Sequence, residues 1–348
     1  MRSVLVLLLT LTTLLGMKAQ ERDWYLVDPH GAGDFRSIQA CFDALESKPD
    51  TWRTVFIAAA EYREKLTLDV YKDKLFLVGL SSPEMPMPRI VWDDHTGRIR
   101  NGHEMTTYDT WTLSLQADDL YLKNLEIVND APLGAGQAVA LETRGDRIWI
   151  DGCRLVGNQD TFFTKGYVSR IYLTDCHIEG TTDFIFGPSI VWFEGCRILA
   201  KSKSYVTAAS TTERNRYGYI FHRCHLEALP SVESLYLGRP WKSTARTVWI
   251  DCRLDAPVHP EGWHDWHDSA RKGSVFYAEA GCRGRGADRS GRVPWSYELT
   301  PEARTEYTLE KVFYKKTGSE QFYDSWLPSE MPIEELEESL MHYRNHLK

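Results

Sequence analysis

The chain has 348 residues, a formal net charge of −8 at pH 7, and 43% hydrophobic and 12% aromatic residues. This length and hydrophobic content are enough for one large soluble domain with a substantial core. The acidic balance argues against nucleic acid or an anionic membrane as the partner.

The first twenty residues have the pattern of a secretory signal. Arg2 gives a positive start, residues 4–15 form an apolar run, and Ala19 offers a small residue near the end. The run is too short for a membrane span. We therefore expect a signal peptide at 1–20, a single domain at 21–348 and an exported protein, periplasmic or secreted.

A short helix is predicted just after the start of that domain. Within residues 37–45, Ile38, Cys41, Phe42 and Leu45 follow the i, i+3, i+4, i+7 spacing of one helix face. Such a helix would cover the first coil of a sheet that otherwise exposes an open edge.

A repeat dominates the middle of the chain. Each unit reads apolar-x-apolar, one or two polar or glycine positions, Cys, x, apolar, and the units are 148–155, 171–178, 191–198, 219–226 and 248–254. Residues 120–127 fit with Leu125 in the Cys slot, and the slots are 28, 23, 20, 28 and 28 residues apart. Alternating strands at such intervals indicate a solenoid of strands. A β-sandwich with accidental Cys spacing is the alternative, which six matching slots disfavour.

The cysteines of the repeat are expected to be interior. They are Cys153, Cys176, Cys196, Cys224 and Cys252, and in a solenoid they stack as small buried hydrophobes. A disulfide between neighbouring slots is conceivable in an oxidising compartment. The spacing of Cys and His is not that of a zinc site.

Two aspartates occupy the same place in consecutive repeats. Asp160 lies seven residues after Cys153, and Asp183 lies seven residues after Cys176. On neighbouring strands they would stand about 4.8 Å apart. Two carboxylates that close cannot both ionise easily, so one should hold a proton while the other stays charged. The pair would supply an acid together with a base or a nucleophile.

Two further features follow in the last third of the chain. His264 and His267 lie close together in 261–268, which could suggest a metal; we favour a structural or surface role because no third ligand is suggested. After Pro332 a helical stripe is predicted to pack along the outside of the solenoid, or to mediate a contact, and consists of Ile333, Leu336, Leu340, Tyr343 and Leu347.

Four motifs, in this order and spacing, resemble the pectin methylesterase (pectinesterase) family: Gln137-Ala-Val-Ala-Leu141, Gln159-Asp-Thr161, Asp183-Phe-Ile-Phe-Gly187 and Leu237-Gly-Arg-Pro-Trp241. The opening 31–39 and the closing 291–328 are similar too. The resemblance, to the bacterial secreted type, implies a right-handed parallel β-helix that hydrolyses galacturonate methyl esters in pectin. It implies no metal, no organic cofactor and a monomer.

The resemblance also assigns roles to residues. Asp183 matches the nucleophile, Asp160 the acid and base, Gln137 and Gln159 the oxyanion donors, and Arg239 the residue that orients Asp183. An arginine there should lower the pKa of Asp183, and amide donors suit a tetrahedral oxyanion. Three aromatic residues match positions along the sugar-binding cleft: Trp241, Phe163 and Phe186.

Departures from the family pattern concern the cleft. Ser243 stands where a second aromatic residue often follows, and residues 94–109 and 256–271 look like insertions that shape the cleft rim. Three other functions remain open on a solenoid: a glycoside hydrolase such as a polygalacturonase, a metal-dependent pectate lyase, or a glycan-binding protein without activity. A polygalacturonase of the inverting type would need its carboxyls ~6.5–9.5 Å apart.

Overall fold

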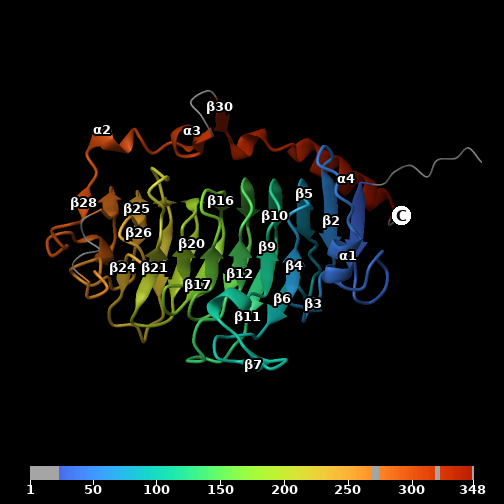
Figure 1. Cartoon of the computed structure of the whole chain (residues 1–348), viewed down its shortest axis with the longest axis horizontal. Coiled ribbons are helices and arrows are strands. Elements are labelled where there is room, and N and C mark those ends of the chain that lie inside the picture. The colour runs from blue at the N-terminus through green and yellow to red at the C-terminus, as the bar shows by residue number, and fades with distance from the viewer. Residues whose placement is uncertain (1–22, 269–273, 318–321, 347–348) are drawn as a thin grey trace, which may run out of the picture.

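The computed structural model describes residues 23–268, 274–317 and 322–346. The chain winds through three long sheets in turn, and every strand pair within these sheets is parallel. Figure 1 shows the resulting elongated coil. The expected parallel β-helix is therefore confirmed. The expected signal peptide at 1–20 lies outside the described residues.

We name the sheets A, B and C. Sheet A has the order β1 (Trp24–Val27), β2 (Arg53–Ile57), β5 (Leu75–Gly79), β10 (Leu120–Lys123), β13 (Ile148–Asp151), β16 (Arg170–Thr174), β19 (Ile190–Glu194), β22 (Tyr219–His222), β25 (Arg246–Ile250), β27 (Phe276–Ala280) and β28 (Tyr297–Glu298). Sheet B has the order β3 (Glu61–Tyr62), β6 (Arg89–Trp92), β11 (Glu126–Asn129), β14 (Arg154–Val156), β17 (His177–Gly180), β20 (Arg197–Ala200), β23 (His225–Ala228) and β26 (Arg253–Leu254). Sheet C has the order β4 (Leu66–Leu68), β9 (Leu113–Leu115), β12 (Leu141–Thr143), β15 (Phe162–Thr164), β18 (Ile185–Gly187), β21 (Tyr205–Ala209) and β24 (Tyr236–Gly238).

The remaining elements are short, apart from one helix. Two antiparallel hairpins join β7 (Ile99–Arg100) to β8 (His103–Glu104) and β29 (Tyr314–Thr317) to β30 (Phe322–Ser325). The helices are α1 (Ile38–Ala44), η1 (Thr107–Asp109), η3 (Arg285–Ala287), α2 (Pro301–Arg304), α3 (Leu309–Val312), η4 (Pro328–Glu330) and α4 (Ile333–His346). Within the described part of the chain, no helix has the length and apolar character needed to cross a membrane.

The corner between sheets A and B explains the repeat. It consists of two residues in each repeat unit, such as Asp175 and Cys176 between β16 and β17. The first residue adopts a left-handed conformation, which glycine and aspartate accept more readily than most residues; Arg223, with φ of 52°, does so too. The second is the Cys slot, whose side chain points into the core.

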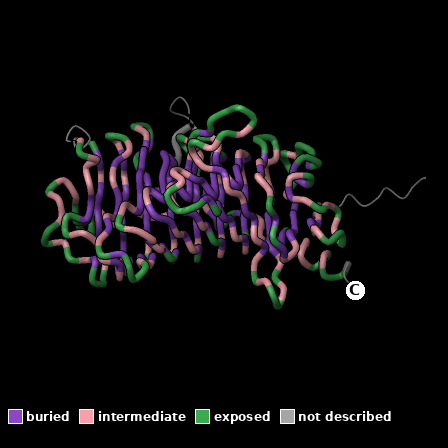
Figure 2. The backbone as a smooth tube through the Cα atoms, turned by 90° about the horizontal axis from the view of Figure 1, so that it is seen from below, coloured by how far each residue is buried: buried purple, intermediate pink, exposed green. Residues whose placement is uncertain are grey.

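The cysteine row is confirmed as interior. All five repeat cysteines are at most 1% exposed and belong to the main core, and Cys282 extends the row by one coil. From Cys176 onward, each thiol of the row approaches a carbonyl of the preceding coil, as when Cys224 Sγ donates to the Phe193 oxygen at 3.4 Å. All seven cysteines are free thiols, so the conceivable disulfide between slots is absent here. Figure 2 shows buried residues along the whole coil and exposed ones mainly in loops.

The helix α1 covers the first coil, as expected. The Ser37 hydroxyl caps it by accepting a hydrogen bond from the Ala40 amide at 3.1 Å. Its apolar face, Ile38, Cys41 and Phe42, is buried in the main core. This face protects the interior end of the solenoid from solvent.

The C-terminal segment covers the outer face of sheet A. Figure 1 shows it running back from β28 to α4, which lies beside β1 and β2. The Tyr343 ring lies 5.9 Å from that of Trp24 and 5.0 Å from that of Phe56, and Leu336 is buried. The prediction that this helix packs on the outside of the solenoid is confirmed, although Leu347 lies outside the described residues.

Candidate active site

The two aspartates stand at the corners that lead into sheet C. Asp160 precedes β15 and Asp183 precedes β18, with left-handed φ angles of 64° and 49°. Phe162 pairs with Ile185 in the parallel register, which places the two aspartates level with each other on neighbouring coils. The Asp160 amide donates to the Thr182 carbonyl at 3.0 Å. The alignment inferred from the repeat is therefore correct.

A cleft of about 210 Å³ opens over these corners. Seven of the eight residues expected at the site line it: Gln137, Gln159, Asp160, Asp183, Phe186, Arg239 and Trp241. The lining also includes Thr107, Tyr108, Ala208 and Trp266, which were not foreseen. Tyr108 and Trp266 come from the two segments expected to shape the rim. Both could have been found from the sequence, because each is an aromatic residue in a segment that interrupts the repeat.

Arg239 holds Asp183 through two hydrogen bonds. Its Nε donates to Oδ1 at 2.9 Å and its Nη2 to Oδ2 at 2.6 Å. The guanidinium itself lies between two rings, 3.9 Å from the centroid of Tyr205 and 3.6 Å from that of Trp266. A planar guanidinium stacks well on aromatic faces while its edge binds a carboxylate. The Asp183 carboxylate is thus fixed in orientation.

Burial and charge separate the two carboxyls. Both aspartates are less than 10% exposed, and burial raises the pKa of each above its usual range. At Asp183 the hydrogen bonds and charge of Arg239 lower the pKa, as expected of an arginine there, but burial outweighs them and the pKa stays above its usual range. The negative charge of Asp183 raises the pKa of Asp160 further. Asp183 therefore ionises first, and Asp160 keeps its proton.

The two glutamines are paired across neighbouring coils. Gln137 and Gln159 form an isolated parallel bridge, and the Ala138 amide donates to the Gln159 carbonyl at 3.0 Å. Both side chains line the cleft beside the aspartates. Two neutral amide groups thus border the same space as the carboxyls.

Two of the three expected aromatic residues line the cleft, and Phe163 does not. The rings of Phe163 and Phe186 stack at 4.3 Å, and Trp241 lies 6.0 Å from Phe186. Phe163 is only 2% exposed, does not line the cleft, and lies under Tyr108 at 5.8 Å. Phe163 and Phe186 are partners on neighbouring strands and almost equally buried, but only Phe186 and Trp241 line the cleft.

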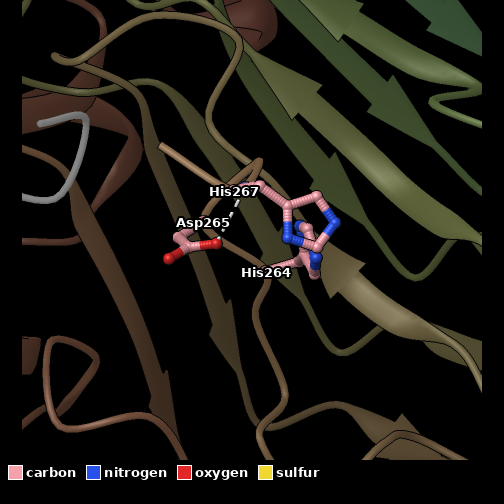
Figure 3. A group of neighbouring side chains, drawn as sticks. All are labelled: His264, Asp265 and His267. Atoms are coloured by element: carbon pink, nitrogen blue, oxygen red, sulfur yellow. Dashed lines mark hydrogen bonds between the residues drawn. The ribbon is translucent and has the colours of Figure 1, made fainter. Parts of the chain in front are cut away.

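His264, Asp265 and His267 are the one group in the described part of the chain whose ligand atoms could gather around a metal, lying within 4.8 Å of one another (Figure 3). Two of them already cap a turn. His264 Nδ1 accepts from the Trp266 amide at 3.0 Å, and Asp265 Oδ1 accepts from the His267 amide at 2.9 Å. A metal would have to compete with the bond at His264, whereas Asp265 keeps a second carboxylate oxygen. Asp265 supplies the third ligand atom that the sequence did not suggest, and the bonds within the turn favour the structural role.

Fold and cleft together define a parallel β-helix with a cleft over two paired carboxyl groups. The sequence profile of the Pectinesterase family matches residues 25–316. Pectinesterase 31 of Arabidopsis thaliana is 34% identical over 282 residues, which cover 78% of this chain and 86% of that protein. Probable pectinesterase A of Neosartorya fischeri is 34% identical over 267 residues, which cover 75% and 79%. The chain belongs to the pectinesterase family, and it de-esterifies pectin.

Solved structures agree with this placement. Pectin methylesterase from carrot superposes with a TM-score of 0.76 at 26% identity, over 83% of this chain and 92% of that one. The enzyme from Yersinia enterocolitica gives 0.68 at 27% identity, over 80% and 98%. These relatives come from a plant, a fungus and a bacterium, so the bacterial type of this chain stays a prediction.

Proposed function

We propose that Asp183 is the nucleophile of this pectin methylesterase and Asp160 its acid and base. The observation that supports this division most directly is the paired hydrogen bond from Arg239 to Asp183 beside a second, buried aspartate. A nucleophile must be ionised and correctly aimed, and a general acid must hold a proton. Among the described residues, only one of these two carboxyls, that of Asp183, forms a salt bridge.

The first half of the reaction forms an acyl-enzyme. An Asp183 oxygen attacks the ester carbonyl carbon, and the carbonyl oxygen becomes an oxyanion. The amides of Gln137 and Gln159 border the cleft and donate to that oxyanion, each worth a few kcal/mol in a site with little water. As the carbon–methoxy bond breaks, Asp160 gives its proton to the leaving oxygen, and methanol departs.

The second half restores the enzyme. Asp160 is now a carboxylate and takes a proton from water, whose oxygen attacks the acyl carbon. The bond to Asp183 breaks, so Asp183 is again ionised on Arg239, Asp160 is again protonated, and the galacturonate is left as a free acid group. Phe186 and Trp241 offer ring faces to the sugars along the cleft. We further propose an exported protein, periplasmic or secreted, that acts as a monomer.

The test is Asp183→Asn, assayed on methylated pectin for methanol, reducing ends and unsaturated ends together. We expect methanol release to fall by about 10³-fold or more, with pectin binding retained in affinity electrophoresis. Asp160→Asn should be similarly impaired, and the double variant should be little worse than the poorer single one. Asp175→Asn is the matched control, because Asp175 is an exposed aspartate in the same left-handed conformation, outside the cleft.

Two results would contradict this assignment. Near-normal methanol release by Asp183→Asn would show that Asp183 is not the nucleophile. Chain cleavage without methanol release by the parent, lost in both variants, would instead indicate a glycoside hydrolase, and unsaturated ends would indicate a lyase.

A further inference from the structure

The turn formed by residues 263–267 lies directly against β24, the strand that ends one residue before Arg239. The Leu237 amide donates to the Gly262 carbonyl at 2.9 Å, and the His264 amide donates to the Gly238 carbonyl at 3.1 Å. Trp263, fully buried, pairs with Gly238 in an isolated parallel bridge. The start of this turn is therefore fixed relative to the residue that precedes Arg239.

Two bulky residues of the turn adopt unfavourable backbone angles. Trp266 and His267 have φ of 62° and 55°, in the left-handed region that large side chains avoid. Such conformations are unfavourable for large side chains and persist where surrounding contacts impose them. The side chains of His264 and Asp265 supply contacts of this kind, since each accepts the backbone amide two residues further on. Figure 3 shows the second of these bonds, from the His267 amide to Asp265.

The strained turn places the Trp266 ring on Arg239. The guanidinium carbon lies over that ring, 3.6 Å from its centroid, and over the Tyr205 ring at 3.9 Å. These two ring contacts restrict the movement of the guanidinium, while its Nε and Nη2 donate to Asp183. We propose that His264 is a positioning residue: its neutral Nδ1 holds the Trp266 turn, and the turn fixes Arg239 on the nucleophile.

This inference rests on the proposed role of Asp183 and adds a pH dependence to it. His264 is faced by the rings of Tyr205 and Tyr236, by His267 and by the charges of Asp265, Glu261 and Arg239. Burial, His267 and Arg239 lower the pKa of His264 and outweigh the two carboxylates, so the imidazole stays neutral into mild acid. Once protonated at Nδ1 it can no longer accept the Trp266 amide, and the turn is released.

Two substitutions of His264 separate this role from simple packing. His264→Phe keeps a ring but removes the acceptor, whereas His264→Asn places an amide oxygen near the position of Nδ1 and does not titrate. At neutral pH we expect His264→Phe to lower kcat by about tenfold with a smaller change in KM, because a misaligned Arg239 affects chemistry more than binding. His264→Asn should recover most of that loss and retain activity further into acid than the parent. His225→Asn, on the outside of sheet B, is the control histidine.

Equal impairment by His264→Phe and His264→Asn, or an effect confined to KM, would overturn the proposal. A second test uses Trp266→Leu: if His264 acts through Trp266, the double variant with His264→Phe should be no worse than Trp266→Leu alone. Additive losses in that cycle would equally contradict the proposal. If Asp183→Asn is inactive while His264→Phe is normal, this inference alone fails; if Asp183→Asn is active, the proposed function fails.

Discussion

The two cleft aspartates share a backbone conformation and nearly the same burial, and they differ in their partners. Asp183 is 6% exposed and Asp160 is 7% exposed, yet only Asp183 forms a salt bridge among the residues that the structure describes. One arginine therefore converts a symmetrical pair into two groups with different chemistry. Because Arg239 itself stacks between rings, that asymmetry depends on residues outside the pair.

Asp160→Asn should stabilise the fold at neutral pH while impairing activity. Burial and the charge of Asp183 raise the pKa of Asp160, so the folded protein holds this proton more tightly than the unfolded chain does. The resulting stability is full below the unfolded pKa and is lost as pH rises towards the folded pKa. We expect the variant to gain about 1–3 kcal/mol at pH 7 and less near pH 4. Urea unfolding at both pH values measures this, and a variant less stable than the parent at pH 7 would contradict it.

Trp241→Ala should affect binding of the polymer more than the chemical step. Trp241 lines the cleft, is partly exposed, and lies against Phe186 at its floor. Loss of a stacking face should raise KM for long pectin about tenfold, with a smaller change in kcat and in melting temperature. Steady-state kinetics on long pectin and on short methylated oligomers checks this. Unchanged kinetics on the polymer would show that the sugar path lies elsewhere.

At the scale of elements, sheet A is buried on both faces. Val55 and Leu77 point into the coil, whereas Phe56 and Phe76 point outward and are covered by the C-terminal segment or its neighbours. A parallel sheet covered on both faces reads as a continuous apolar run, as β5 and the last three residues of β2 do. The C-terminal segment therefore belongs to the core of the domain, although it lies outside the coil.

Leu336→Ala tests that contribution. Leu336 is 3% exposed on α4, and its loss should lower the free energy of unfolding by about 2–4 kcal/mol. Met341→Ala, in the same helix but 54% exposed, should change it by less than about 0.5 kcal/mol. Neither change should alter methanol release at 25 °C, since α4 lies on sheet A. Equal stabilities for the two variants in urea unfolding would mean that the helix is not part of the folding unit.

The coil was predictable from sequence because its corner is local. The Cys slot, the residue before it and the alternating strands are all set within about eight residues, and they place Asp160 and Asp183 in register. The access of Phe163 to the cleft was not predictable. Alternation gives the side of the sheet to which Phe163 points, but not that Tyr108 would cover it. Nor was the contact of Trp266 with Arg239, because it depends on the path of a segment that leaves the repeat.

At the scale of the whole molecule, activity should survive exhaustive chelation. Calcium is bound by six to eight oxygen ligands, whereas this cleft combines two carboxyls with a guanidinium that is bound to one of them. We expect methanol release after dialysis against EDTA to remain within about twofold of its value at matched ionic strength. Activity lost on chelation and restored by calcium alone would favour the lyase reaction. Activity restored by zinc instead would indicate a metal site at His264, Asp265 and His267.

The fixed two-residue corner has a consequence for how this enzyme can diversify. One added residue there would reverse the inward and outward sides of the next strand, so length changes at that edge disrupt the whole coil. The connections on either side of sheet C differ widely in length, from Pro188 and Ser189 between β18 and β19 to residues 130–140 between β11 and β12. The intervals between the repeat cysteines are therefore uneven because the connections that form the cleft walls differ in length. New substrate preferences can arise by insertion at those walls while the opposite edge stays unchanged.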